Sequence, residues 1–221
     1  MMQSDSVWQR RSANESEIIS APLYNVMIGL TLMWGFAMNY AIVDAVPVET
    51  VLSIGPIGLI IGYIVSCFFG IYLYTSSDKP LVSFIGYNFV VVPIGIILVP
   101  FLYQFDSNLI QRAMAATGAV TAGMMFCSSL APNFFLSIGR TLFLSLILAI
   151  VVELIGVFVF KAPMHWMDYV MVVIFSGYIG YDWARANMIP KTLDNAIDSA
   201  ASLYIDIINL FIRILQILSR R

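Results

Sequence analysis

The sequence has 221 residues, of which 60% are hydrophobic and 11% charged, and its formal net charge is −2 at pH 7. Soluble domains are roughly half apolar and a quarter charged, so this composition excludes an ordinary water-soluble fold. The small negative charge also excludes a surface of clustered Lys and Arg that would bind nucleic acid.

A polar tail, residues 1–20, opens the chain and lacks the apolar middle region of a cleavable signal, so we expect a cytosolic tail. Seven apolar segments follow, each near the ~20 residues that a helix needs to cross a hydrocarbon core about 30 Å thick. In chain order they are Leu23–Val43, Val51–Tyr74, Leu81–Tyr103, Leu109–Leu130, Thr141–Phe160, Trp166–Tyr181 and Ala196–Leu218. The sequence therefore predicts an all-α, polytopic membrane protein, with about seven transmembrane helices in one domain over residues 21–221 and the last helix central.

Small residues predict where these helices pack closely. Gly58 and Gly62 form a GxxxG pair, and Ala115, Ala119 and Gly123 form a stripe at a spacing of four residues. Both patterns are typical of helix backbones in close contact.

The positive residues of the short loops predict the orientation. If the first six segments cross, six positive residues fall on the side of the N-terminal tail and two on the other side: Arg10, Arg11, Lys79, Arg140, Arg185 and Lys191 against Arg112 and Lys161. We therefore expect a multi-pass protein of the cell (inner) membrane with a cytoplasmic N-terminus. A full seventh crossing would place Arg213, Arg220 and Arg221 outside, where positive charge is disfavoured, so a re-entrant last helix remains the alternative.

Three acids lie within apolar segments: Glu153, Asp182 and Asp206. A charge at the bilayer centre costs about 2.5 to 3.5 kcal/mol, so each acid needs a compensating role. Asp44 and Asp168 lie at segment ends, where we expect only capping or interfacial positions. Glu153 has no polar neighbour at helical spacing, which leaves either a protonated structural acid or a cation contact.

The last segment carries one polar face. Its members stand at steps of four, four, three and four residues, which places them on one side of a helix: Asp198, Ser202, Asp206, Asn209 and Arg213. Such a face should turn toward a cavity or other helices rather than lipid. Asp198, Ser202, Asn209 and Glu153 are therefore candidate pore or cation contacts.

Asp182 and Asp206 are the candidate pH sensor and gate. They lie on either side of the turn between the last two segments, with their midpoint at Asp194, which we expect to cap the last helix. Two carboxyl groups at the same depth in the membrane would share a proton and titrate together. Loss of that proton would leave two like charges, which would separate or recruit a cation. The alternative is local pairing along each helix, of Asp182 with Arg185 and of Asp206 with Arg213.

Catalysis is not expected. The single histidine, His165, excludes an HExxH metal site, and no Ser/His/Asp set is apparent. The run around Asp182 is GYD rather than the GxGD of intramembrane aspartyl proteases. We expect no cofactor and no firm metal site, with Ca²⁺ passing at Asp182 and Asp206.

The C-terminal runs YDWARA and DNAIDSAASLYIDIINLFIRIL resemble the signature of the transmembrane Bax inhibitor motif-containing family. Weaker collinear matches extend the resemblance over roughly residues 80 to 215. It implies seven helices with a central last helix and, from a bacterial branch, a pH-sensitive calcium leak channel gated by two aspartates, which correspond to Asp182 and Asp206. The channel-forming branch has an acid and an arginine in its second segment, whereas Val51–Tyr74 contains neither.

Two functions therefore compete. The first is a calcium leak channel with the Asp182 and Asp206 gate. The second is a regulatory protein that modulates a membrane-anchored protease or a stress response without conducting ions, because some bacterial relatives resemble such modulators. Its activity would depend on the polar tail.

Overall fold

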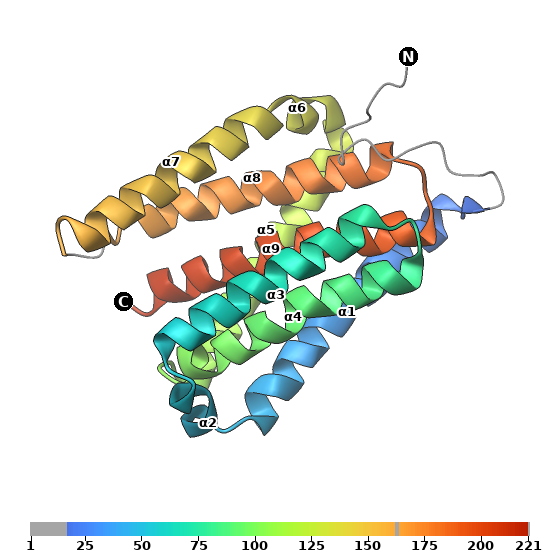
Figure 1. The fold of residues 1–221 in the computed structure, drawn as a ribbon. Coiled ribbons are helices and arrows are strands. Elements are labelled where there is room, and N and C mark those ends of the chain that lie inside the picture. The colour runs from blue at the N-terminus through green and yellow to red at the C-terminus, as the bar shows by residue number, and fades with distance from the viewer. Residues whose placement is uncertain (1–16, 162–163, 221) are drawn as a thin grey trace, which may run out of the picture. The chain divides into compact units, whose positions relative to one another are not determined.

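The computed structural model describes residues 17–161 and 164–220, which form helices and no strand (Figure 1). The predicted tail falls mostly outside these residues. Seven described helices have 20 or more residues and two have six: α1 (Ala21–Ala45), α2 (Val48–Ser53), α3 (Pro56–Ser76), α4 (Pro80–Leu102), α5 (Ser107–Leu130), α6 (Pro132–Ser137), α7 (Gly139–Phe158), α8 (Met167–Met188) and α9 (Leu193–Leu218).

Six of the long helices are apolar enough to cross a membrane, which confirms the all-α, polytopic membrane fold. The exception is α8, which carries Asp168, Asp182 and Arg185. Its 22 residues span about 33 Å at about 1.5 Å per residue, enough to cross a hydrocarbon core of about 30 Å. The last helix, α9, is the most buried of the six, as expected for a helix in a central position.

Local signals set the helix boundaries. Ser20 and Asp106 cap α1 and α5 by accepting backbone N–H bonds from Leu23 and Leu109. Gly55, at a φ of +79°, separates α2 from α3, so the second apolar segment is interrupted near its start. At α9 the predicted cap was wrong: the helix begins before Asp194, and Thr192 Oγ1 accepts the N–H of Asn195.

The transmembrane part divides into two compact units. The first unit contains the described residues up to Gln104 together with Ala186–Ser202. The second unit contains Phe105–Arg185 and the chain from Leu203 onward. The helix α9 therefore contributes its first part to one unit and its remainder to the other.

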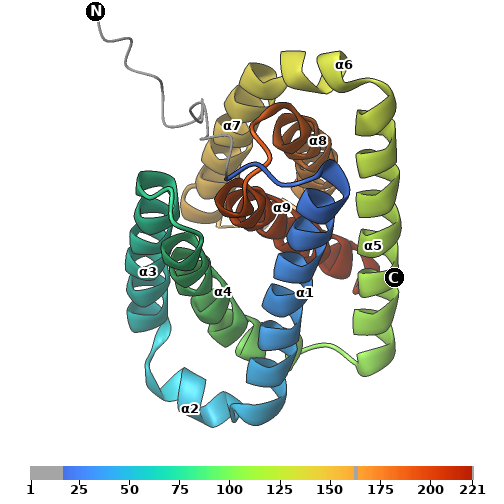
Figure 2. The ribbon, with the colours of Figure 1, turned by 90° about the vertical axis from the view of Figure 1, so that its right-hand side faces the viewer.

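In the first unit, α3 and α4 lie side by side (Figures 1 and 2). Their backbones come closest at Gly70 and Gly86: a Cβ on Gly70 would lie 2.5 Å from the Gly86 carbonyl oxygen, and one on Gly86 would lie 2.7 Å from that of Gly70. The prediction for Gly58 and Gly62 was wrong, because a Cβ on Gly62 would meet nothing within 4 Å and one on Gly58 would meet only Ile54.

In the second unit, the short α6 joins α5 to α7, and α7 runs beside α8 (Figure 2). Two glycines of α8 bring it close to its neighbours: a Cβ on Gly177 would contact the Leu142 side chain, and one on Gly180 would overlap the Phe135 ring. The small-residue stripe of α5 does not pack in this way, since a Cβ on Gly123 would meet nothing within 4 Å.

Candidate functional site

The segment of α8 that carries Asp182 is held by side chains at the end of α5. Ser128 Oγ donates to the Gly180 carbonyl oxygen at 2.5 Å, and Trp183 Nε1 donates to Ser129 Oγ at 2.9 Å. Together with the Phe135 ring against Gly180, these contacts fix the α8 backbone on both sides of Asp182. Asp182 is therefore presented by a rigid stretch of helix.

Asp182 of α8 and Asp206 of α9 form a carboxyl pair within the second unit. Both residues are buried, at 8% and 7% exposure. The two side chains are close enough to interact electrostatically. Because two carboxylates in contact repel each other, such a buried pair favours a proton on one of the two groups. No N–H or hydroxyl group of the described residues donates to Asp206 Oδ2. A proton shared by the two groups would remove the repulsion between them.

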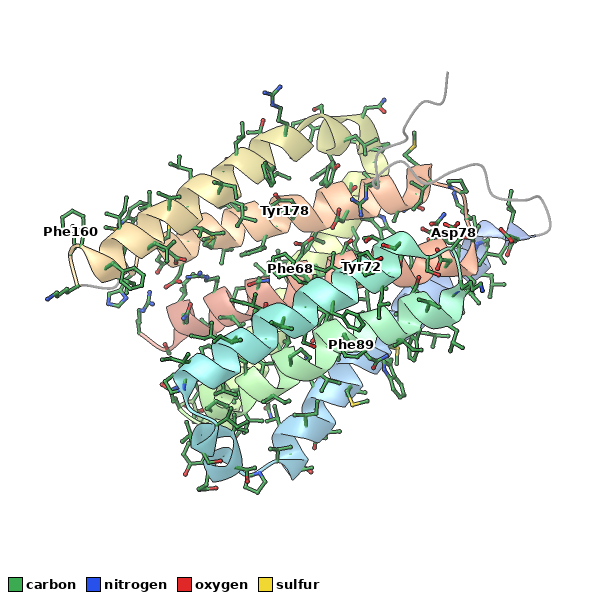
Figure 3. The ribbon with its side chains drawn as sticks, viewed as in Figure 1. Phe68, Tyr72, Asp78, Phe89, Phe160 and Tyr178 are labelled. Atoms are coloured by element: carbon green, nitrogen blue, oxygen red, sulfur yellow. The ribbon has the colours of Figure 1, made fainter. Side chains whose placement is uncertain are left out.

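Two further side chains of α8 surround the carboxyl pair. Arg185 Nη2 lies 3.7 Å from Asp182 Oδ1, one helical turn along, so the predicted local pair of these two residues exists beside the carboxyl pair. Tyr178, labelled on α8 in Figure 3, is close enough to interact electrostatically with both acids. The arginine next to the carboxyl pair therefore comes from α8 itself and not from the second segment.

Arg213 lies at the centre of a separate ion network in the second unit. Its Nη1 and Nη2 atoms bond Glu153 Oε1 and Oε2 at 2.5 and 2.9 Å, and Nη1 also bonds Asp168 Oδ1 at 2.8 Å. Arg220 Nη2 lies 2.6 Å from Asp168 Oδ2, and its Nη1 donates to the His165 carbonyl oxygen at 3.0 Å. Two acids and two arginines from three helices and the end of the chain thus neutralise one another.

This ion network corrects three expectations. Glu153, which the sequence left without a polar neighbour, forms a two-bond ion pair with Arg213. Arg213 does not pair with Asp206 along α9 but with acids of α7 and α8. Asp168, expected only to cap a helix or lie at an interface, is buried to 3% exposure and joins both arginines.

Two other side chains of the polar face of α9 form hydrogen bonds within their own helix. Ser202 Oγ donates to the Asp198 carbonyl oxygen at 3.3 Å, and Asn209 Nδ2 donates to that of Ile205 at 2.8 Å. Asp198 is buried, at 7% exposure. Asp198 and Ser202 belong to the first unit, and Asp206, Asn209 and Arg213 to the second.

A polar cluster in the first unit was missed in the sequence. Ser83 Oγ of α4 donates to Asp194 Oδ1 of α9 at 2.6 Å, and Tyr24 of α1 hydrogen bonds Ser199 at 3.0 Å and the Asn195 carbonyl oxygen at 3.3 Å. The interacting residues are more than 100 positions apart, so no local spacing could reveal them. These bonds tie the first part of α9 to α1 and α4.

Within the described residues, no group of three or more His, Cys, Asp and Glu side chains is placed to hold a metal ion. The acids on α7, α8 and the second-unit part of α9 occur instead as the carboxyl pair and as the ion network. The carboxyl pair is thus the acidic site whose charge depends on a shared proton.

The comparisons with known proteins agree with this architecture. A family profile described as "Inhibitor of apoptosis-promoting Bax1" matches residues 21–221. An uncharacterized protein of Helicobacter pylori is 32% identical over 160 residues, which is 70% of this chain and 67% of that protein. An uncharacterized membrane protein of Vibrio cholerae is 33% identical over 111 residues, and an uncharacterized protein of Campylobacter jejuni is 31% identical over 111 residues.

The chain spans about two thirds of the Helicobacter relative, 49% of the Vibrio relative and 47% of the Campylobacter relative. The family profile, in contrast, covers every transmembrane helix of this chain, from the first residue of α1 to the end of α9. The resemblance seen in the C-terminal runs is thereby confirmed, and the chain is a multi-pass membrane protein that belongs to the Bax inhibitor-1 family.

Proposed function

We propose that this protein is a pH-sensitive calcium leak channel whose gate is the carboxyl pair of Asp182 and Asp206. The observation that carries the proposal is the proximity of two buried carboxyl groups on neighbouring helices. A buried pair of this kind exists in two charge states that differ by one proton, and each state favours a different spacing of the helices.

With the shared proton present, a hydrogen bond holds α8 to α9. Loss of the proton leaves two carboxylates in contact, and Arg185, 3.7 Å from Asp182, offsets only one of the two negative charges. The remaining charge favours separation of the helices or entry of a cation. Calcium is a suitable cation because it prefers carboxylate oxygens as ligands. The leak should therefore increase as the pH rises through the titration of the carboxyl pair.

The ion network supports this assignment because it neutralises two other acids of the second unit. Glu153 and Asp168 are both bound to arginines, so neither offers an open carboxylate to a passing cation. The mechanism involves no covalent chemistry and no cofactor: the only reactive event is the transfer of one proton.

A leak assay tests the proposal. Purified protein in liposomes that enclose a calcium-sensitive dye should admit calcium at a rate that depends on pH. A gate controlled by one proton changes its open fraction by up to about tenfold per pH unit. Asp206→Asn removes one titrating group, so the leak of this variant should vary little over the same pH range.

Asp78→Asn is the matched control, since Asp78 is an exposed aspartate in the turn between α3 and α4 (Figure 3). This variant should keep the pH dependence of the parent protein. A pH response of Asp206→Asn equal to that of the parent would contradict the assignment of the gate. A parent protein without any calcium leak would contradict conduction and favour the regulatory function through a protease partner.

We also propose that the protein lies in the inner membrane with its N-terminus in the cytoplasm. The support is the distribution of positive residues among the loops, six on one side and two on the other.

A further inference from the structure

A cavity of about 680 Å³ lies in the first unit between α3 and α4 and is closed on one side by α1. Its lining residues extend from Gly58 to Ser66 on α3 and from Phe84 to Ile97 on α4, with Trp34 of α1 and Ile54 near the end of α2. The stretch of α4 alone is about 20 Å long at about 1.5 Å per residue. We call this cavity the α3–α4 groove.

The α3 and α4 backbones meet at Gly70 and Gly86, close to the turn that joins the two helices. On α3 the lining residues lie between this contact and α2, whereas on α4 they lie on both sides of Gly86. Figure 2 shows the two helices close together near this turn and farther apart toward α2. Gly58 and Gly62 face this wider part, and a Cβ on Gly62 would enter open space.

Three polar side chains of the lining, Trp34, Asn88 and Ser66, bond to other lining residues. Trp34 Nε1 donates to Asn88 Oδ1 at 3.0 Å, and Asn88 Nδ2 donates to the Phe84 carbonyl oxygen at 2.8 Å. Ser66 Oγ donates to the Phe89 carbonyl oxygen at 2.7 Å. What faces the cavity is therefore the apolar surface of the aliphatic and aromatic side chains, with Phe89 labelled on α4 in Figure 3. A ligand that needs hydrogen bonds would find few partners here.

The groove is continuous with surface that lipid already covers. Its three long helices are all apolar enough to cross a membrane. The α3 side chains beside the groove are exposed and apolar, including Ile57 at 73% and Ile61 at 56% exposure. The hydrocarbon of the bilayer therefore reaches the mouth of the groove directly.

We propose that the α3–α4 groove is a binding site for one acyl chain of a membrane lipid. The volume falls within the range of about 300 to 1,000 Å³ typical of specific small-molecule sites. Its length of about 20 Å is about two thirds of a hydrocarbon core of about 30 Å, enough for one extended acyl chain to lie along it.

Photolabelling tests the site. The full-length protein is reconstituted in liposomes that contain a phospholipid with a diazirine on one acyl chain, irradiated, digested and mapped by mass spectrometry. The label should concentrate on the lining residues of α3 and α4, above its level on exposed residues of α5 and α7. In Gly62→Leu, whose new side chain fills the groove, labelling of these residues should fall severalfold.

Gly123→Leu is the matched control, because a Cβ on this exposed glycine of α5 also meets nothing within 4 Å. It should leave labelling of the groove unchanged. Labelling spread evenly over all exposed helices of the parent protein, or labelling of the groove equal in Gly62→Leu and the parent, would overturn the proposal. So would a disulfide-linked dimer of Gly62→Cys, in a background with Cys67→Ser and Cys127→Ser, since a second copy would then occupy the groove.

Discussion

At the scale of single residues, the ion network explains why an acid lies in the middle of the apolar segment α7. Glu153 and Arg213 are 60 positions apart, and Glu153 would be an uncompensated charge without Arg213. Their side chains are 27% and 22% exposed, so solvent screens the pair only in part. The two bonds between the guanidinium and the carboxylate also fix the geometry of the pair.

Replacement of one charge should therefore cost more than replacement of both. Removal of one partner from a buried ion pair costs about 3 to 5 kcal/mol, and we expect about 3 kcal/mol for Arg213→Leu because the pair is partly exposed. The double variant Arg213→Leu with Glu153→Leu should recover much of this loss, since no unpaired glutamate remains. Unfolding in detergent, followed by circular dichroism during denaturant titration, measures both. A double variant less stable than Arg213→Leu would contradict charge compensation.

At the scale of elements, two pairs of glycines in the first unit have opposite roles. Gly70 and Gly86 allow the α3 and α4 backbones to touch, whereas Gly58 and Gly62 line the groove where the helices separate. Only the first pair follows the usual function of small residues in membrane helices. The GxxxG spacing alone therefore does not identify the close contact.

Alanine substitutions should distinguish these two roles. Gly70→Ala places a Cβ 2.5 Å from the Gly86 carbonyl oxygen and 2.9 Å from Phe89 Cβ, which forces the helices apart. Such overpacking costs about 1 to 3 kcal/mol. Gly62→Ala meets no atom within 4 Å and should keep or slightly raise stability, because alanine is favoured over glycine in a helix by about 1 kcal/mol. The thermal unfolding midpoint in detergent compares the variants, and equal midpoints would contradict the close contact.

At the scale of the whole molecule, the ion network bears on how α9 crosses the membrane. A full crossing would place Arg213 and Arg220 outside, which the positive-inside rule disfavours. Both arginines are bound to acids, Arg213 to Glu153 and Asp168 and Arg220 to Asp168, so neither is an uncompensated positive charge. With 26 residues, α9 extends about 39 Å at about 1.5 Å per residue and exceeds a core of about 30 Å. These facts favour a full crossing over a re-entrant helix.

Single cysteines can locate the loops. In a background with Cys67→Ser and Cys127→Ser, sealed right-side-out membrane vesicles are treated with a maleimide that cannot cross the membrane. Gln104→Cys should react, because this loop is expected outside, and Asp78→Cys should react only after the membrane is made permeable. Ser219→Cys, just after α9, should react like Gln104→Cys if α9 crosses fully. A Ser219→Cys that reacts only after permeabilisation would contradict the full crossing.

The sequence by itself determined the helical membrane architecture. Each long helix lies within a few residues of an apolar segment, because hydrophobic length is a local property that the bilayer selects directly. The C-terminal runs likewise determined the family. The short turn between α8 and α9 predicted that Asp182 and Asp206 lie near each other, because residues at equal distances from such a turn lie at equal depth. The role of this carboxyl pair as a gate stays a prediction.

Only the tertiary structure decided the partners of Arg213, the burial of Asp168, the α3–α4 contact at Gly70 and Gly86, and the groove beside Gly62. Each depends on which faces of distant helices meet. In a chain whose helices are apolar on almost every side, hydrophobic periodicity carries little information about those faces. The contacts are set instead by side-chain fit and by charges that must be neutralised across 45 to 60 residues of chain.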